Sequence, residues 1–166
     1  VGFAYQDQAF PIGAGQTISQ PYTVAFQTEL LDPQERQKVL EVGTGSGYQT
    51  AVLVELGMRV FTVERIKSLY HSSSALLRNL DFGSQCFYGD GYAGLPTYGP
   101  FDKILITAGA PEIPEALKAQ LKLGGVLVAP IGHQSNQVMI RCERISETEF
   151  QETQHGNFVF VPMLNG

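Results

Sequence analysis

The sequence predicts a doubly wound α/β fold, with a mostly parallel sheet and an antiparallel edge. Between Lys38 and Pro130, short apolar runs alternate with segments of helical periodicity, which is the order of βαβ units. Glycine-containing turns follow several of these runs, as expected where strands lead into helices. Near the end of the chain, residues 138–145 and 150–153 alternate around a turn and indicate an antiparallel pair.

The length and charge of the chain restrict the classes of protein to which it can belong. Its 166 residues suit one domain with one sizeable core, and a hydrophobic content of 43% argues against disorder. The net charge of −5 lacks the basic footprint of a nucleic-acid binder. No apolar run approaches the ~20 residues of a membrane span, and the first residues lack a signal-peptide pattern. We therefore expect a cytoplasmic monomer that binds neither nucleic acid nor membrane.

The cysteines and histidines do not form a metal-binding pattern. Cys86 and Cys142 stand alone, without the spacing of metal ligands, and two reduced thiols are expected rather than a disulfide. His71, His133 and His155 are far apart and have no cysteine or acid cluster beside them. The sequence therefore predicts no metal site.

The first part of the chain differs in pattern from the rest. Residues 1–13 have little periodicity and are expected to form an extended loop. Pro21 suits the first turn of a helix, which continues over 22–31 and stops at Asp32-Pro33. Ser19 or Gln20 then lies at the N-cap, and on the residues alone we favour Ser19, which is a preferred cap residue. A serine nucleophile is poorly supported, because no histidine base is placed nearby by the sequence.

The α/β core begins at Lys38. Each strand is expected from a short run rich in β-branched or apolar residues, and each helix from apolar residues three or four apart. Strands are expected at 39–42, 60–64, 85–88, 101–107, 126–130 and 158–162, and helices at 48–56, 66–80 and 114–121.

The most informative stretch is the turn after the first core strand. It runs from Glu41 to Gly47 and has glycine at three alternate positions, where backbone must turn tightly or approach a ligand closely. The dinucleotide fingerprint requires glycine or alanine at its sixth position, but that position is Tyr48 or Thr50, depending on the glycine that starts the count. The Gly-Lys-Ser/Thr of a P-loop is also absent from this stretch. A pyrophosphate-bearing cofactor is therefore disfavoured.

Two acidic residues follow later strands. Glu64 lies about 20 residues past the first glycine, the spacing at which a carboxylate meets ribose hydroxyls in nucleotide-binding units. Asp90 lies in Gly89-Asp90-Gly91, which could be a hairpin turn. The residues after it do not alternate like a returning strand, and its place past a strand end favours a ligand-binding role.

On the basis of these and further residues, the chain resembles the protein-L-isoaspartate O-methyltransferases. The glycine stretch resembles the acid-x-G-x-G-x-G motif of S-adenosylmethionine-dependent methyltransferases in general. The Thr17-Ile18-Ser19-Gln20-Pro21 stretch is more specific to the isoaspartate family. Further matching stretches follow in the family's order, and the resemblance covers essentially all 166 residues: Tyr5-Gln6-Asp7, Pro11-Ile12-Gly13, Glu64-Arg65, Gly89-Asp90-Gly91, Ala110-Pro111-Glu112-Ile113-Pro114 and Phe160-Val161-Pro162.

The resemblance implies a Rossmann-like, class I methyltransferase domain spanning residues 1–166. Residues 1–34 would be its substrate-side segment and helix, and residues 35–166 its cofactor-binding core. The resemblance implies that Ser19 is the catalytic residue and orients the substrate carboxylate, with Asp7 and Val161 also on the substrate side. From composition alone, Asp7 is a solvated turn acid. The resemblance implies S-adenosylmethionine as cofactor, with these binding residues: Glu41, Gly43, Gly45, Gly47, Glu64, Asp90 and Gly91.

The implied reaction is methyl transfer to the free carboxylate of L-isoaspartyl residues in damaged proteins or peptides, which starts their repair. A carboxylate is ionised near pH 7, so no general base is needed. Two other functions remain open at this point. One is a small-molecule methyltransferase of the same fold, and the other is a protein that binds the cofactor without catalysis.

Overall fold

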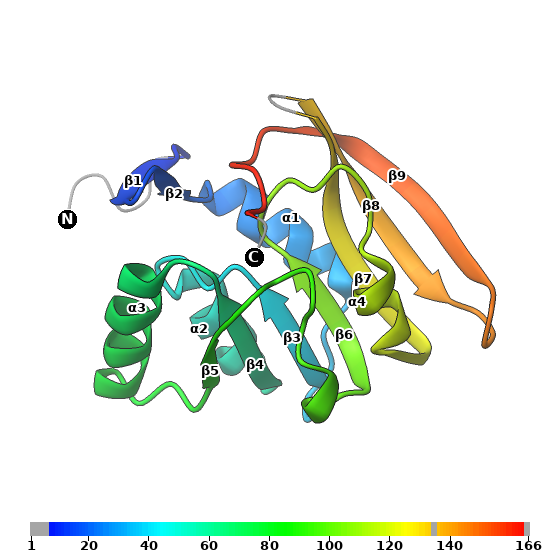
Figure 1. The fold of residues 1–166 in the computed structure, drawn as a ribbon, viewed down its shortest axis with the longest axis horizontal. Helices are drawn as coiled ribbons and strands as arrows, with labels where there is room; N and C mark the ends of the chain where they lie inside the picture. Colours follow the sequence, from blue (N-terminus) through cyan, green and yellow to red (C-terminus); the bar gives the residue numbers. More distant parts are fainter. Residues whose placement is uncertain (1–6, 134–135, 165–166) are drawn as a thin grey trace.

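The structure is a computed structural model that describes residues 7–133 and 136–164. Its main sheet has seven strands in the order β5-β4-β3-β6-β7-β8-β9 (Figure 1). The first five strands of this order are parallel, and β8 and β9 are antiparallel to their neighbours. The strands are β3 (Lys38–Val42), β4 (Arg59–Glu64), β5 (Gln85–Tyr88), β6 (Phe101–Ile106), β7 (Leu121–His133), β8 (Asn136–Arg144) and β9 (Phe150–Phe158).

The predicted doubly wound sheet with an antiparallel edge is confirmed. Strand β3 lies between β4 and β6, with Val42 opposite Val63 on one side and Ile106 on the other. From β3 the chain builds outward through β4 and β5, then returns to add β6 on the opposite side. This reversal leaves a crevice at the carboxyl ends of β3, β4 and β6, where open α/β sheets bind ligands.

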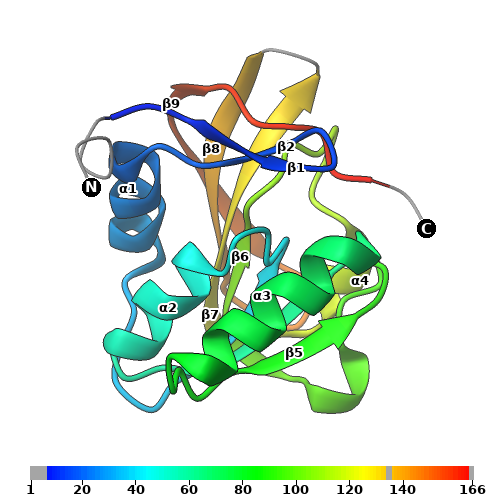
Figure 2. The same cartoon turned by 90° about the vertical axis from the view of Figure 1, so that its left-hand side faces the viewer.

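Helices cover both faces of the sheet (Figure 2). Residues of α1 and α2 pack in one cluster with Val39, Leu105 and Val128, and α4 contributes Leu117 to a second cluster around Leu40 and other core residues. The two clusters match the alternation of side chains along β3 and β6, whose neighbouring residues face opposite sides. The helices are α1 (Pro21–Leu31), α2 (Tyr48–Glu55), α3 (Lys67–Asn79) and α4 (Glu115–Ala119), with a 3₁₀ turn η1 (Pro96–Tyr98).

The segment expected to be a loop ends in a small hairpin. Strands β1 (Phe10–Gly13) and β2 (Gln16–Ile18) pair antiparallel as a separate two-stranded sheet. Gly13 and Gly15 adopt positive φ angles of 89° and 72°, which lets the chain reverse within two residues. The expectation of a loop was therefore wrong from Phe10 onward, because glycine spacing rather than apolar alternation specifies this turn. Residues 1–6 lie outside the described residues.

Two further expectations were wrong. The N-cap of α1 is Gln20, without a side-chain capping bond, so Ser19 does not cap the helix. The stretch 158–162 is not a separate strand, because Phe158 ends β9 and Pro162 forms only an isolated bridge to Gly109. Its apolar alternation instead serves packing, since Phe160 is buried beneath an exposed Val159.

The described residues contain neither a membrane-spanning helix nor a cluster of metal ligands. Within 7–133 and 136–164, no helix is long and apolar enough to cross a membrane. Over the same ranges, no three His, Cys, Asp or Glu side chains lie close enough to hold a metal ion.

Candidate active site

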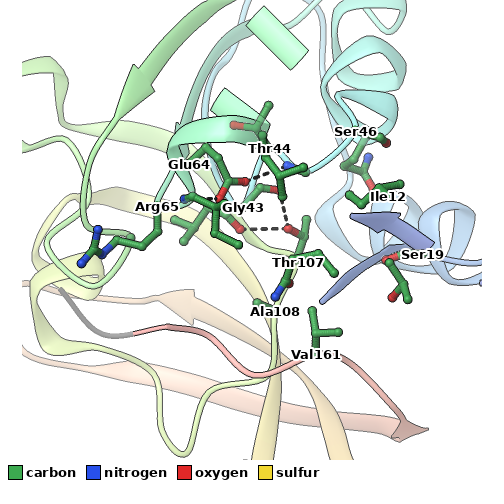
Figure 3. A pocket seen from close by; sticks show the side chains of 18 of the residues that line it. Ile12, Ser19, Gly43, Thr44, Ser46, Glu64, Arg65, Thr107, Ala108 and Val161 are labelled. Carbon is green, nitrogen blue, oxygen red and sulfur yellow. Dashed lines mark hydrogen bonds between the residues drawn. The ribbon is translucent and has the colours of Figure 1, made fainter. Parts of the chain in front are cut away.

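A cleft lies at the carboxyl ends of β3, β4 and β6. The β1–β2 hairpin and the C-terminal segment 161–164 enclose it from the outside. We call the part around the turn 43–47 and Glu64 the glycine end, and the part around Ser19, Thr107 and 161–164 the serine end (Figure 3). Segments from the two ends of the chain thus meet over the centre of the sheet.

The glycine turn needs its glycines for backbone conformation and for space. Gly43 has φ 98°, and a Cβ there would lie 2.5 Å from Thr107 Oγ1. Gly47 has φ 85° at the N-cap of α2, and a Cβ there would meet Leu77 at 3.1 Å. Gly43 and Gly45 line the cleft, whereas Gly47 packs beneath α3 and is not among the lining residues. The turn thus exposes backbone to the cleft at its first two glycines only.

Glu64 ends β4 at the wall of the cleft, and backbone fixes its carboxyl group. Its Oε2 accepts a hydrogen bond from the Gly45 N–H at 2.9 Å, and its Oε1 accepts one from the Ile66 N–H at 2.8 Å. Each oxygen of a carboxylate has two lone pairs, so one remains on each oxygen for a ligand. The backbone therefore fixes the orientation of the Glu64 carboxylate at the wall of the cleft.

Glu41 lies below the turn rather than in the cleft. It is fully buried and accepts a short hydrogen bond from the Thr50 hydroxyl, while its Oε1 has no partner among the described residues. Burial raises the pKa of Glu41 to about 7, although hydrogen bonds from Thr50 and Thr62 oppose the rise. Thr62 in turn shares a 2.6 Å hydrogen bond with Thr44 of the turn. Glu41 is thus placed to support the turn from below.

Asp90 and Gly91, the two residues after β5 that were predicted to bind the cofactor, differ in their position relative to the cleft. Gly91 lines the cleft, and a Cβ there would lie 2.6 Å from Val42 Cγ1. Asp90 is not among the lining residues; its Oδ1 accepts a hydrogen bond from the Tyr92 N–H at 2.9 Å and closes a local turn. No return strand pairs with β5 after this turn within the described residues, so the hairpin alternative is excluded.

The serine end has several apolar residues and the hydroxyl group of Ser19. Ser19 and Val161 both lie along this end, next to Thr107 and Ala108 (Figure 3). In the part of the chain that the structure describes, the Ser19 hydroxyl makes no hydrogen bond to another residue. A free hydroxyl beside apolar walls can donate to a carboxylate oxygen.

Asp7 lies outside the cleft and acts on α1. Its Oδ1 accepts a hydrogen bond from the Tyr22 N–H at 3.1 Å, and its backbone oxygen accepts one from Gln20 Nε2 at 3.3 Å. It therefore satisfies one of the N–H groups that a helix start leaves unpaired. Asp7, 15 positions before Tyr22, therefore makes the helix-capping hydrogen bond that was expected from Ser19.

Sequence reasoning missed several lining residues. Thr107 closes the floor of the cleft, with its Oγ1 2.9 Å from the Val42 oxygen and 2.7 Å from the Gly43 oxygen. Ile12 of the hairpin reaches over the turn, 3.4 Å from the position of a Cβ on Gly45. Gln49 reaches the cleft from the first turn of α2. The position of Thr107 directly after a core strand was the one available signal, whereas the other two depend on tertiary contacts.

Comparisons with known proteins agree with this geometry. The family model described as protein-L-isoaspartate(D-aspartate) O-methyltransferase matches residues 2–166. A protein-L-isoaspartate O-methyltransferase of Flavobacterium psychrophilum is 60% identical, over 98% of this chain and 76% of its own length. One of Cytophaga hutchinsonii is 55% identical, over 97% of this chain and 73% of its own.

Solved structures agree as well. A protein-L-isoaspartate O-methyltransferase structure superposes with a TM-score of 0.88 at 26% identity, over 97% of this chain but only 54% of that longer chain. A Plasmodium falciparum structure assigned to the same enzyme, in complex with S-adenosyl-L-homocysteine, gives a TM-score of 0.83 at 25% identity. That match covers 98% of this chain and 82% of the other. The chain therefore belongs to the protein-L-isoaspartate(D-aspartate) O-methyltransferase family.

Proposed function

We propose that this enzyme transfers a methyl group from S-adenosylmethionine to the free carboxylate of L-isoaspartyl residues in proteins and peptides. The observation that supports this most directly is that Glu64 and Ser19 line the same cleft. An acceptor suited to ribose hydroxyls thus shares a cavity with a donor suited to a carboxylate. The methyl ester formed would cyclise to a succinimide, which hydrolyses partly to normal aspartate.

The glycine end fits the proposed cofactor. A side chain at Gly43 would fill the space before Thr107, so the turn keeps a cradle open against the backbone. Glu64 would hold the ribose through its two free lone pairs, and Gly91 leaves room beside Val42. When bound, S-adenosylmethionine supplies an electrophilic methyl group on a positively charged sulfur. Glu41 and Gly47 would act indirectly by supporting the turn, and Asp90 by shaping the loop that contains Gly91.

The serine end fits a substrate carboxylate that needs no general base. The pKa of a free carboxyl group is about 4, so the group is already a nucleophile at pH 7. Among the described lining residues, the charged side chains are Glu64 and Arg65, both at the glycine end. Ser19 would donate to one carboxylate oxygen while the other forms the new O–CH₃ bond and the S–CH₃ bond breaks. Such alignment can contribute roughly 7–11 kcal/mol to lowering a barrier.

Cofactor binding and substrate binding would fall to different segments of the chain. We assign residues 35–166 to cofactor binding and residues 1–34 to the substrate side, completed by Val161 and its neighbours. Asp7 would support the substrate side indirectly, by stabilising the start of α1 next to Ser19. We further propose that the enzyme acts as a cytoplasmic monomer without nucleic-acid partners, in keeping with its net charge of −5.

The decisive experiment measures labelled methyl transfer from S-adenosylmethionine to an isoaspartyl peptide, with the aspartyl isomer as control. Transfer to the first peptide and none to the second is expected. Transfer only to small-molecule acceptors would favour a different methyltransferase of the same fold. Cofactor binding without transfer to any acceptor would favour a binding-only protein.

A further inference from the structure

The two ends of the Gln49 side-chain amide are treated differently by the protein. Gln49 is the second residue of α2, only 7% exposed, and it lines the cleft. Its Nε2 donates a hydrogen bond to Thr28 Oγ1 of α1 at 3.0 Å. Its Oε1 is buried and has no hydrogen-bond partner among the described residues. An amide oxygen in this state costs free energy until a donor reaches it.

The hydrogen-bond network fixes which way this amide points. The Thr28 hydroxyl has a single hydrogen, which it donates to the Val24 oxygen at 2.7 Å. Toward Gln49 it can therefore only accept, so the amide must present its NH₂ group to Thr28. Turning the amide over would place two acceptors against each other at this contact. The unsatisfied oxygen of Gln49 is consequently a built feature of the site.

The position of Gln49 indicates which part of a ligand it meets. The glycine turn reaches Glu64 on β4 through the Gly45 N–H. Gln49 instead reaches α1, which packs over β6 and β7, on the other side of β3. The ribose lies in the middle of the cofactor, so if Glu64 holds it and the adenine lies toward Gly91, past β5, Gln49 faces the opposite end. That end is an amino acid, and its α-ammonium has three hydrogen-bond donors.

We propose that Gln49 binds the amino-acid end of the cofactor, with its Oε1 accepting a hydrogen bond from the α-ammonium. This rests on the proposed function, since it requires S-adenosylmethionine in the cleft. Thr28 acts as a positioning residue, because its hydroxyl binds the NH₂ end of the amide and leaves the oxygen end without a protein partner among the described residues. Helix α1 follows Ser19 directly, so this contact joins the cofactor site to the helix beside the substrate site.

The test compares two ligands by calorimetry on the full chain. S-adenosylhomocysteine contains the amino-acid end, whereas 5′-methylthioadenosine has the same nucleoside without it. Gln49→Met should weaken S-adenosylhomocysteine binding about 10- to 100-fold, as for a lost hydrogen bond to a charged group. Binding of 5′-methylthioadenosine should not change, which also shows that the variant is folded.

Three further variants sharpen the result. Gln49→Glu keeps an acceptor oxygen for the ligand but loses the donor to Thr28, so it should bind S-adenosylhomocysteine more tightly than Gln49→Met does. Thr28→Val removes the positioning acceptor while leaving Gln49 in place, so it should weaken S-adenosylhomocysteine alone and by less than Gln49→Met. Gln151→Met makes the same chemical change on the exposed strand β9 and should alter neither affinity.

The outcomes separate cleanly. If Gln49→Met weakens the binding of both ligands equally, Gln49 has a structural role and the inference is overturned. Unchanged S-adenosylhomocysteine affinity in Gln49→Met would overturn it too. So would loss of binding in Gln49→Glu together with retained binding in Gln49→Met, because residue 49 would then face the carboxylate of the ligand rather than its ammonium. Failure of the unaltered enzyme to bind S-adenosylhomocysteine would instead overturn the proposed function.

Discussion

The two ends of the cleft are built in different ways. The glycine end comes from one continuous stretch, residues 41–66, in which strand ends and a turn already bond to one another. The serine end comes from segments far apart in the sequence, the hairpin residues 16–19 and the C-terminal residues 161–164. The Glu64 carboxylate at the glycine end bonds to backbone N–H groups, while the Ser19 hydroxyl has no partner in the described part of the chain. The difference suggests that one end is preformed for its ligand and the other is completed by it.

This difference also explains why substitutions should act differently at the two ends. At the glycine end, removing a side chain breaks bonds that hold the turn as well as bonds to the ligand. At the serine end, removing the Ser19 hydroxyl should affect only the reacting complex, because no other described residue bonds to it. Stability measurements alongside kinetics can therefore separate the two ends.

Ser19→Ala should give the largest effect on catalysis. Losing a donor that acts in the transition state lowers the rate about 10²–10³-fold where the site excludes water. Cofactor affinity and the melting midpoint should be almost unchanged, because Ser19 neither caps α1 nor bonds to another described residue. Single-turnover rates on an isoaspartyl peptide, with Ser72→Ala on α3 as control, test this. A variant that keeps its rate per folded molecule would remove Ser19 from catalysis.

Glu41 should make stability depend on pH. Its pKa is raised from 4.5 to about 7, so between these values the native protein keeps a proton that the unfolded chain has lost. The free energy of unfolding should therefore fall by about 3 kcal/mol as the pH rises through this range. Glu41→Gln has no such proton and should lose this dependence.

Denaturant unfolding at pH 5 and pH 8 measures this contribution. The exposed Glu55→Gln serves as the matched control and should keep the dependence of the unaltered protein. An equal pH dependence in Glu41→Gln would show that the buried carboxyl group does not titrate in this range.

Glu64→Ala should weaken cofactor binding without stopping transfer. Loss of the paired contact to the ribose should cost roughly 1.5–3 kcal/mol, or about 10- to 150-fold in affinity. Glu64→Gln retains one acceptor oxygen and should lie between the two. Calorimetry with S-adenosylhomocysteine measures this, and unchanged affinity in the alanine variant would remove Glu64 from the site. Preferential binding of NAD would contradict the cofactor assignment as a whole.

Asp7→Ala should give the smallest effect, on stability alone. The change removes the acceptor for the Tyr22 N–H at the start of α1, and a lost helix cap costs about 1 kcal/mol. Asp7→Asn keeps an acceptor oxygen and should recover most of this loss in thermal unfolding. If Asp7→Ala instead raises the KM for the peptide with no change in stability, Asp7 contacts the substrate directly.

The sequence by itself determined the α/β core and the glycine end. Strand β5 falls at its expected bounds, and other core strands and the α1–α3 helices begin or end within a few residues of the prediction. Both Glu64 and Gly43 were identified because their roles depend on local order along the chain: a strand, a turn of fixed spacing, and the next strand. The resemblance added Ser19, which local propensity alone assigned to a helix cap.

Only the tertiary structure decided which groups share the cleft and which support it. It placed Glu41, Gly47 and Asp90 outside the lining, because their side chains or positions face the core or a local turn. Gln49 and Ile12 became lining residues through contacts with segments 21 or more positions away. Side-chain periodicity specifies which face of an element is buried, but not which distant segment covers it. The physical reason is that long-range packing and the pairing of buried polar groups depend on the whole fold.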